Sequence, residues 1–200
     1  SPEAPPGRVT RGVRDRLFER ARGGGWVLNL SSGMSGEILL GGRKVIVEDV
    51  GPERPPAISN RRADRMSREA KGWASVDELF AQVKIDYPRT SEPVLRGFVQ
   101  HGSKQNVEGR IVWKRDPAIL NGFVPTELWA IVRKIKAPII YVLGGGSTIV
   151  PPETQEELRR ALPQVEIVTM PGLGHYPSDD QPGDFLVIVD RFLEATRTGK

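Results

Sequence analysis

The sequence predicts an α/β protein with a mostly parallel sheet, helices on both faces of that sheet, and an inserted helical block. Two observations predict this fold class. Near both ends of the chain, short apolar runs alternate with amphipathic helical patterns, which is typical of a parallel sheet covered on both faces. Residues 71–136 lack this alternation and show mainly helical patterns.

The first part of the chain contains one helical pattern and two strand patterns. Residues 13–21 (VRDRLFERA) predict a short amphipathic helix that ends at three glycines. Residues 26–30 (WVLNL) predict a buried strand before a Ser/Gly turn. Residues 44–50 (KVIVEDV) predict a second strand, because they are rich in β-branched residues and a proline-rich segment stops them.

The middle of the chain is predicted to be helical. Ser75 and Glu78 form a capping box, in which we expect the serine to cap a backbone N–H and the glutamate to reach back to the serine amide. Further helices are predicted over 91–101 and 126–135. The only strand signal in this block is the short segment 109–116.

Alternation returns after this block. Strands are predicted at 138–143 and 165–170, and a helix at 152–162. Residues 182–195 predict the last helix, whose apolar face repeats at helical spacing through Phe185, Ile188, Val189, Phe192 and Leu193.

These patterns divide the chain into three parts. Residues 1–12 are polar and rich in proline, so we expect a disordered lead rather than a signal or an anchor. Residues 13–70 and 137–200 are expected to form the α/β core, and residues 71–136 a helical cap inserted between two of its strands.

Composition and charge limit the function classes. Hydrophobic residues make up 38% of the 200 residues and charged residues 27%, as in a soluble globular protein. The absence of cysteine excludes a disulfide framework, a thiolate metal site and a cysteine nucleophile. No apolar run approaches the roughly 20 residues that a membrane span needs. We therefore expect a cytoplasmic location and no membrane partner.

The net charge of +4 gives little evidence for a nucleic-acid partner. Six arginines face three acids in residues 1–25, and residues 61–71 form a second basic segment. No stripe of interleaved aromatic residues and no known binding motif accompanies them. A solvated basic face explains these charges, so nucleic acid is not expected as a partner.

Candidate chemistry lies after the strands, because ligands of parallel sheets bind at the carboxyl ends of the strands. His175, one of two histidines, follows the strand that ends at 170 and could transfer a proton there. Asp49 ends the strand at 50 and could orient a histidine. The glycine-rich loop after 143 lacks a phosphate-binding lysine and runs into two prolines, which argues against a phosphate site.

Three segments together resemble the C-terminal part of an α/β-hydrolase. They read VIVEDVGPE, KIKAPIIYVLGGGSTIVPPETQEELRRALPQVEIVTMPGLGHYP and PGDFLVIVDRFLEA, and the resemblance extends over about residues 44–196. It covers the order of strand, cap, strand, acid loop, helix, strand, Gly-x-Gly-His and final helix. The resemblance implies that His175 is the catalytic base.

The resemblance also bears on the catalytic acid. The family often has an aspartate four residues before the proline of the acid loop, and here that position is Ser147. Some members carry the acid at the end of the strand after the nucleophile, and Asp49 occupies that place. Asp179 and Asp180 follow the histidine too closely to be the usual choice.

The nucleophile is the weakest match to the family. Its elbow reads Gly-x-Ser-x-Gly, whereas this chain has NLSSGMSG after the strand. The direct register fits Met34 and Gly36 but puts Gly33 where the serine belongs. A shifted register places Ser35 as nucleophile but ends in a glutamate, and Ser32 lacks the second glycine. We predict Ser35 ahead of Ser32, with Gly33, Met34 and Gly36 supplying the backbone of the turn; an elbow without a nucleophile remains the alternative.

The segment before the elbow is short for this family. About 25 residues precede the first strand, and they include no oxyanion loop of the HGG type. An oxyanion hole takes one donor from the residue after the nucleophile and one from that loop. The N-terminal strands of the family are therefore expected to be missing.

Two functions follow. The first is a serine hydrolase of carboxylic esters or lactones, which needs no metal or organic cofactor and whose partner is the small-molecule substrate. The second is a truncated or non-catalytic hydrolase-fold protein that binds a small ligand or completes its sheet as a homo-oligomer. Dehalogenation is disfavoured because the elbow has no aspartate. Aromatic residues of the cap are candidates to line the pocket: Trp113, Phe123 and Trp129, with Trp73 and Phe98.

Overall fold

The structure is a computed structural model that describes residues 26–28, 44–53, 65, 68–116 and 127–195. The described residues fall into two compact units. The core unit lies within Ser1–Pro52 and Glu127–Lys200, and the inserted unit lies within Glu53–Thr126. The sequence predicts these two boundaries at 70/71 and 136/137.

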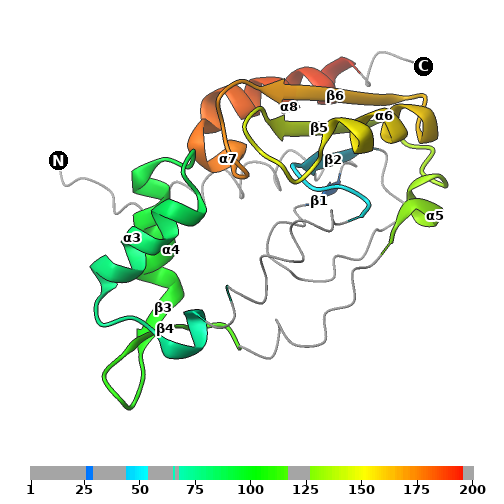
Figure 1. Cartoon of the computed structure of the whole chain (residues 1–200). Helices are drawn as coiled ribbons and strands as arrows, with labels where there is room; N and C mark the ends of the chain where they lie inside the picture. Colours follow the sequence, from blue (N-terminus) through cyan, green and yellow to red (C-terminus); the bar gives the residue numbers. More distant parts are fainter. Residues whose placement is uncertain (1–25, 29–43, 54–64, 66–67, 117–126, 196–200) are drawn as a thin grey trace. The chain divides into compact units, whose positions relative to one another are not determined.

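The core unit contains a four-stranded parallel sheet in the order β1-β2-β5-β6 (Figure 1). Its strands are β1 (Trp26–Leu28), β2 (Val45–Glu48), β5 (Ile139–Gly144) and β6 (Val165–Met170). Three of them lie within segments that the sequence predicted as strands, and β5 runs one residue past the predicted 138–143. The parallel α/β fold class is therefore confirmed.

Alternating residues of the strands build one apolar layer on each face of this sheet. Ile46, Ile140 and Val142 pack against Phe185, Val189 and Phe192 of helix α8 (Pro182–Ala195). On the other face, Val47, Ile139, Tyr141 and Leu143 pack with Trp129 and Val132 of α5 (Trp129–Val132) and with Leu158 of α6 (Pro152–Ala161). Both faces are covered, which explains why β5 is buried at every position.

The described part of the inserted unit contains a helix pair and a hairpin. Its elements are α3 (Val76–Asp86), α4 (Glu92–Gly102), β3 (Ser103–Gln105) and β4 (Ile111–Trp113), and the two strands pair antiparallel. Leu79, Leu95 and Val99 are buried between the elements together with Trp73, whose ring meets that of Trp113 edge to face at 6.2 Å.

Three local predictions need correction. The hydroxyl of Ser75 accepts from the amide of Glu78, as expected, but Glu78 accepts from the amide of Ala74 and not from that of Ser75. Strand β3 was not predicted, because its short polar sequence has no strand pattern. Helix α5 spans only Trp129–Val132, shorter than the predicted 126–135.

Among the described residues, no helix combines the length and the apolar content needed to cross a membrane. The predicted helix at 13–21 lies outside the described residues.

The end of β5 is in close contact with the loop that follows β6. A Cβ atom on Gly144 would lie 1.8 Å from the carbonyl oxygen of Gly174, far inside van der Waals contact. The two backbones can therefore approach only because residue 144 has no side chain.

Replacing Gly144 with alanine should destabilise the fold, because the added methyl group meets backbone and not a side chain that could move. We expect a loss on the order of 3 kcal/mol or more in the free energy of unfolding, measured in urea. Gly183→Ala is the matched control, since its Cβ would meet nothing within 4 Å. Equal stability of the two variants would contradict the close approach.

Candidate active site

Three polar residues gather at the carboxyl edge of the sheet, each from the loop after a different strand. Asp49 follows β2, Ser147 follows β5 and His175 follows β6. Because these strands are neighbours in the sheet, their loops emerge side by side. The structure thus brings together His175, the predicted base, Asp49, the predicted acid, and Ser147, where the resemblance had led us to look for an aspartate.

Asp49 is held rigidly at the point where β2 ends. Its amide donates to the carbonyl oxygen of Val142 at 3.0 Å, which continues the pairing with β5. Its φ is +43°, a left-handed conformation that is uncommon outside glycine, asparagine and aspartate. Only 1% of the residue is exposed. A buried carboxylate in this setting needs internal donors.

Three donors converge on the Asp49 carboxylate. The amide of Gly144 donates to Oδ1 at 3.2 Å. The hydroxyl of Ser147 donates to Oδ2 at 2.5 Å, and Nδ1 of His175 lies 2.8 Å from the same oxygen. An ionised carboxylate can accept all three bonds. The arrangement therefore suits a charged aspartate facing a histidine.

His175 is oriented by this contact. A carboxylate accepts from Nδ1–H, so the neutral ring carries its proton on Nδ1 and leaves Nε2 as the basic nitrogen. The side chain is 16% exposed. Gly172 opens the loop with a φ of +76°, which favours glycine. This loop presents a histidine with the geometry of a general base.

The glycine-rich loop after β5 supports the histidine loop. The amide of Gly145 donates to the carbonyl oxygen of Met170 at 2.9 Å, and that of Gly146 to Leu173 at 2.8 Å. Both amides are used within the protein, in keeping with the sequence argument against a phosphate site. The glycines serve the close packing of two loops.

Two contacts of the site were not predicted. Ser147 was identified only as a departure from the expected acid position, yet its hydroxyl binds Asp49, the predicted acid. Glu48, the neighbour of Asp49, binds Ser178 in the histidine loop. The signal for Ser147 was its spacing from the proline, and no pattern in the sequence pointed to the pair of Glu48 and Ser178.

The predicted nucleophiles and backbone donors lie outside the described residues. These are Ser32, Ser35, Gly33, Met34 and Gly36, and Phe123 lies outside them too. Their roles stay predictions.

The two described tryptophans of the predicted pocket pack into apolar clusters. Trp113 belongs to the cluster of the inserted unit. Trp129 was predicted as part of the cap but lies in the core unit. It is 7% exposed and packs into the apolar cluster on one face of β5.

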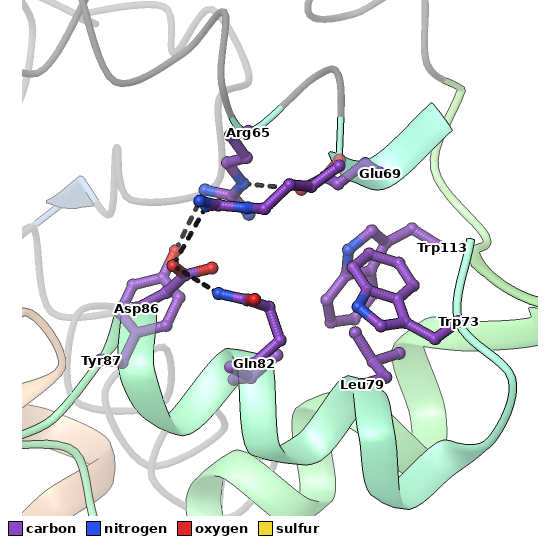
Figure 2. Close-up of a pocket in the computed structure, with 10 residues that line it drawn as sticks. Arg65, Glu69, Trp73, Leu79, Gln82, Asp86, Tyr87 and Trp113 are labelled. Atoms are coloured by element: carbon purple, nitrogen blue, oxygen red, sulfur yellow. Dashed lines mark hydrogen bonds and ion pairs between the residues drawn. The ribbon is translucent and has the colours of Figure 1, made fainter. Parts of the chain in front are cut away.

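A small pocket lies inside the inserted unit (Figure 2). Trp73, Trp113 and Leu79 line its apolar side, as Figure 2 shows. Its polar rim is closed by the protein's own pairs: Arg65 with Glu69 and Tyr87, and Arg68 and Gln82 with Asp86. No histidine or serine lines this pocket. It therefore offers no nucleophile and base of the kind found at the sheet edge.

A metal centre has no support in the part of the chain that the structure describes. No group of three or more histidine, cysteine, aspartate or glutamate side chains is placed to hold an ion there.

No family model matches the chain. Over 56 residues it is 45% identical to the sn-1-specific diacylglycerol lipase ABHD11 of Mus musculus; this segment is 28% of the chain and 18% of the mouse protein. The chain therefore matches less than a fifth of that relative's length.

Solved structures match over far more of the chain. The E-2-(acetamidomethylene)succinate hydrolase structure matches with a TM-score of 0.68 at 18% identity, over 93% of this chain and 74% of that one. An α/β hydrolase from Novosphingobium aromaticivorans matches with a TM-score of 0.64 at 19% identity, over 93% and 72%. At these identities the likeness establishes the fold.

Replacing Ser147 with alanine should destabilise the protein, because the buried Asp49 carboxylate loses one of its donors. We expect a loss of about 1–2 kcal/mol in the free energy of unfolding by urea at neutral pH. Thr148→Ala, at the exposed neighbouring position, is the control and should unfold like the wild type. If both variants matched the wild type, the bond between Ser147 and Asp49 would not contribute to stability.

Proposed function

Since the chain has the α/β-hydrolase fold, we propose that it is a serine hydrolase of carboxylic esters or lactones. The observation that carries the proposal is the contact between His175 Nδ1 and the buried Asp49 carboxylate at the carboxyl edge of the sheet. A base oriented by an acid is the part of a catalytic triad that activates a serine.

The chemistry proceeds in two halves. Ser35, or Ser32 in the alternative register, attacks the carbonyl carbon while Nε2 of His175 takes the hydroxyl proton. Asp49 stabilises the imidazolium that forms, and His175 then gives the proton to the leaving alcohol oxygen. Water, deprotonated by His175, then attacks the acyl-serine; the bond between the acyl carbon and the serine oxygen breaks, His175 returns the proton to that oxygen, and the carboxylic acid leaves. The amide after the nucleophile, from Gly36 or Gly33, supplies one oxyanion donor.

The substrate class follows from this chemistry. Neither half-reaction requires a metal or an organic cofactor, and a lactone is an ester closed into a ring. The mouse relative is a diacylglycerol lipase, which supports an ester carbonyl as the group attacked. We propose a small-molecule ester or lactone as the partner, with a cytoplasmic location and no nucleic acid or membrane.

Labelling with a fluorophosphonate, which reacts with activated serines, tests the function. We expect peptide mapping to find the label at Ser35 or Ser32, the two proposed nucleophiles. His175→Ala should abolish labelling. His101→Ala, which removes the other histidine at an exposed position, is the matched control and should label normally. A folded wild-type protein without label would reject the hydrolase and favour the non-catalytic alternative.

Asp49→Asn tests the acid separately. Asparagine tolerates the left-handed backbone at this position and keeps the shape of the side chain. It cannot stabilise the imidazolium and allows the wrong histidine tautomer, so hydrolysis of p-nitrophenyl acetate should fall roughly 10³–10⁴-fold in kcat. Circular dichroism serves as the control for folding. A fall of less than about tenfold would show that another group acts as the acid.

A further inference from the structure

We propose that Glu48 is a positioning residue for His175: it ties down the loop that carries the histidine, and it places a second negative charge near the ring. The proposal rests on the proposed function in taking His175 as the catalytic base. Glu48 does not touch the reacting atoms and acts through the histidine.

Both carboxylate oxygens of Glu48 accept hydrogen bonds from Ser178, three residues after His175. The amide of Ser178 donates to Oε1 at 2.8 Å, and the Ser178 hydroxyl donates to Oε2 at 3.0 Å. Only 7% of Glu48 is exposed. Ser178 lies in the first turn of the short helix α7 (Pro177–Asp180), where backbone amides have no partner within the helix. The bond therefore satisfies an amide that would otherwise need another acceptor.

Two consecutive carboxylates thus hold two points of one loop. Asp49 binds the ring of His175, and Glu48 binds the backbone and hydroxyl three residues later. With one end held by each acid, the loop cannot move away from the end of β2 without breaking both contacts. This fixes the distance between the histidine and its acid.

Holding Ser178 in place does not by itself explain why a carboxylate stands at position 48. The pKa of Glu48 lies above its ordinary value, chiefly because the side chain is buried and in smaller part because of the charge of Asp179, while the two hydrogen bonds from Ser178 and the charge of His175 act to lower it. A buried carboxylate is costly, and a neutral side chain could also fill the position. The attraction between Glu48 and His175 offers the reason, because it favours the protonated ring.

Among the described residues, the charged and titratable groups around the ring come from three places. Glu48 ends β2 and Asp49 follows it, Asp179 lies in α7, and the ring of Tyr176, the next residue in the chain, lies 4.8 Å from the His175 ring between centroids. The loop after β5 contributes the neutral Ser147. Removing the charge of Glu48 leaves Asp49 as the acid in direct contact with the histidine, so the expected effect is a shift and not a loss of titration.

The decisive experiment is an NMR titration of the histidine rings in the full chain with Glu48→Gln. Glutamine keeps the size of the side chain and an acceptor for the Ser178 amide, but it has no charge. The pKa of His175 should fall by about 0.5–1 unit, because its protonated form loses a nearby negative charge. His101, the only other histidine in the sequence, serves as the internal control and should titrate unchanged.

Turnover of p-nitrophenyl acetate gives a second readout. Neutral His175 is the active base, so a lower pKa moves the rise of kcat/KM toward lower pH in Glu48→Gln. The plateau should fall about 3–10-fold, since the imidazolium formed during attack is less stable. Ser178→Ala keeps the charge and removes one bond, and it should lower the plateau without lowering the pKa of His175. Glu156→Gln, at an exposed ion pair with Arg159, is the matched control.

An unchanged pKa of His175 in folded Glu48→Gln overturns the proposal, whatever the turnover does. If Glu48→Gln does not fold, Ser178→Ala tests the proposal instead. A plateau of kcat/KM equal to that of the wild type in Ser178→Ala then overturns the proposal. The titration needs no activity, so it separates the two ideas: a wild type without fluorophosphonate label rejects the hydrolase, while the response of His175 to Glu48 is still measured.

Discussion

The site depends on one steric constraint, the crossing of the histidine loop over the end of β5. Asp49 follows β2 and His175 follows β6, with β5 between these two strands. Neighbouring strands lie about 4.8 Å apart, so the two loops start roughly 10 Å from each other. The histidine loop bridges this gap by passing over Gly144, where the carbonyl oxygen of Gly174 takes the space of a side chain.

The electrostatics of the site follow from this crossing. Once the loop is over β5, the His175 ring meets Asp49, and the same aspartate oxygen accepts from Ser147 at the end of β5. The loop after β5 therefore supplies a hydrogen-bond donor to Asp49, the predicted acid. Glu48 then holds the far end of the loop through Ser178. Each contact limits the freedom of the histidine.

The regular elements could be predicted because their signals are local. Apolar runs marked all four strands of the sheet, and helical spacing marked the face of α8 that packs on it. Strand β3 and helix α7 were missed because each is three or four residues long and polar. His175 and Asp49 were predicted because each follows a predicted strand and because their spacing resembles that of the α/β-hydrolases. The hydrogen bonds of Ser147 and Glu48 could not be predicted from the sequence. They join residues about 100 or more positions apart, which come close only when the backbone is folded.

The central claim is that Asp49 sets the tautomer of His175, and the nitrogen-15 NMR spectrum of the histidine ring tests it most directly. At a pH where the ring is neutral, we expect Nδ1 of His175 to carry the proton and Nε2 to show the shift of an unprotonated nitrogen. In Asp49→Asn this preference should be lost. A neutral His175 protonated on Nε2 in the wild-type protein would contradict the account.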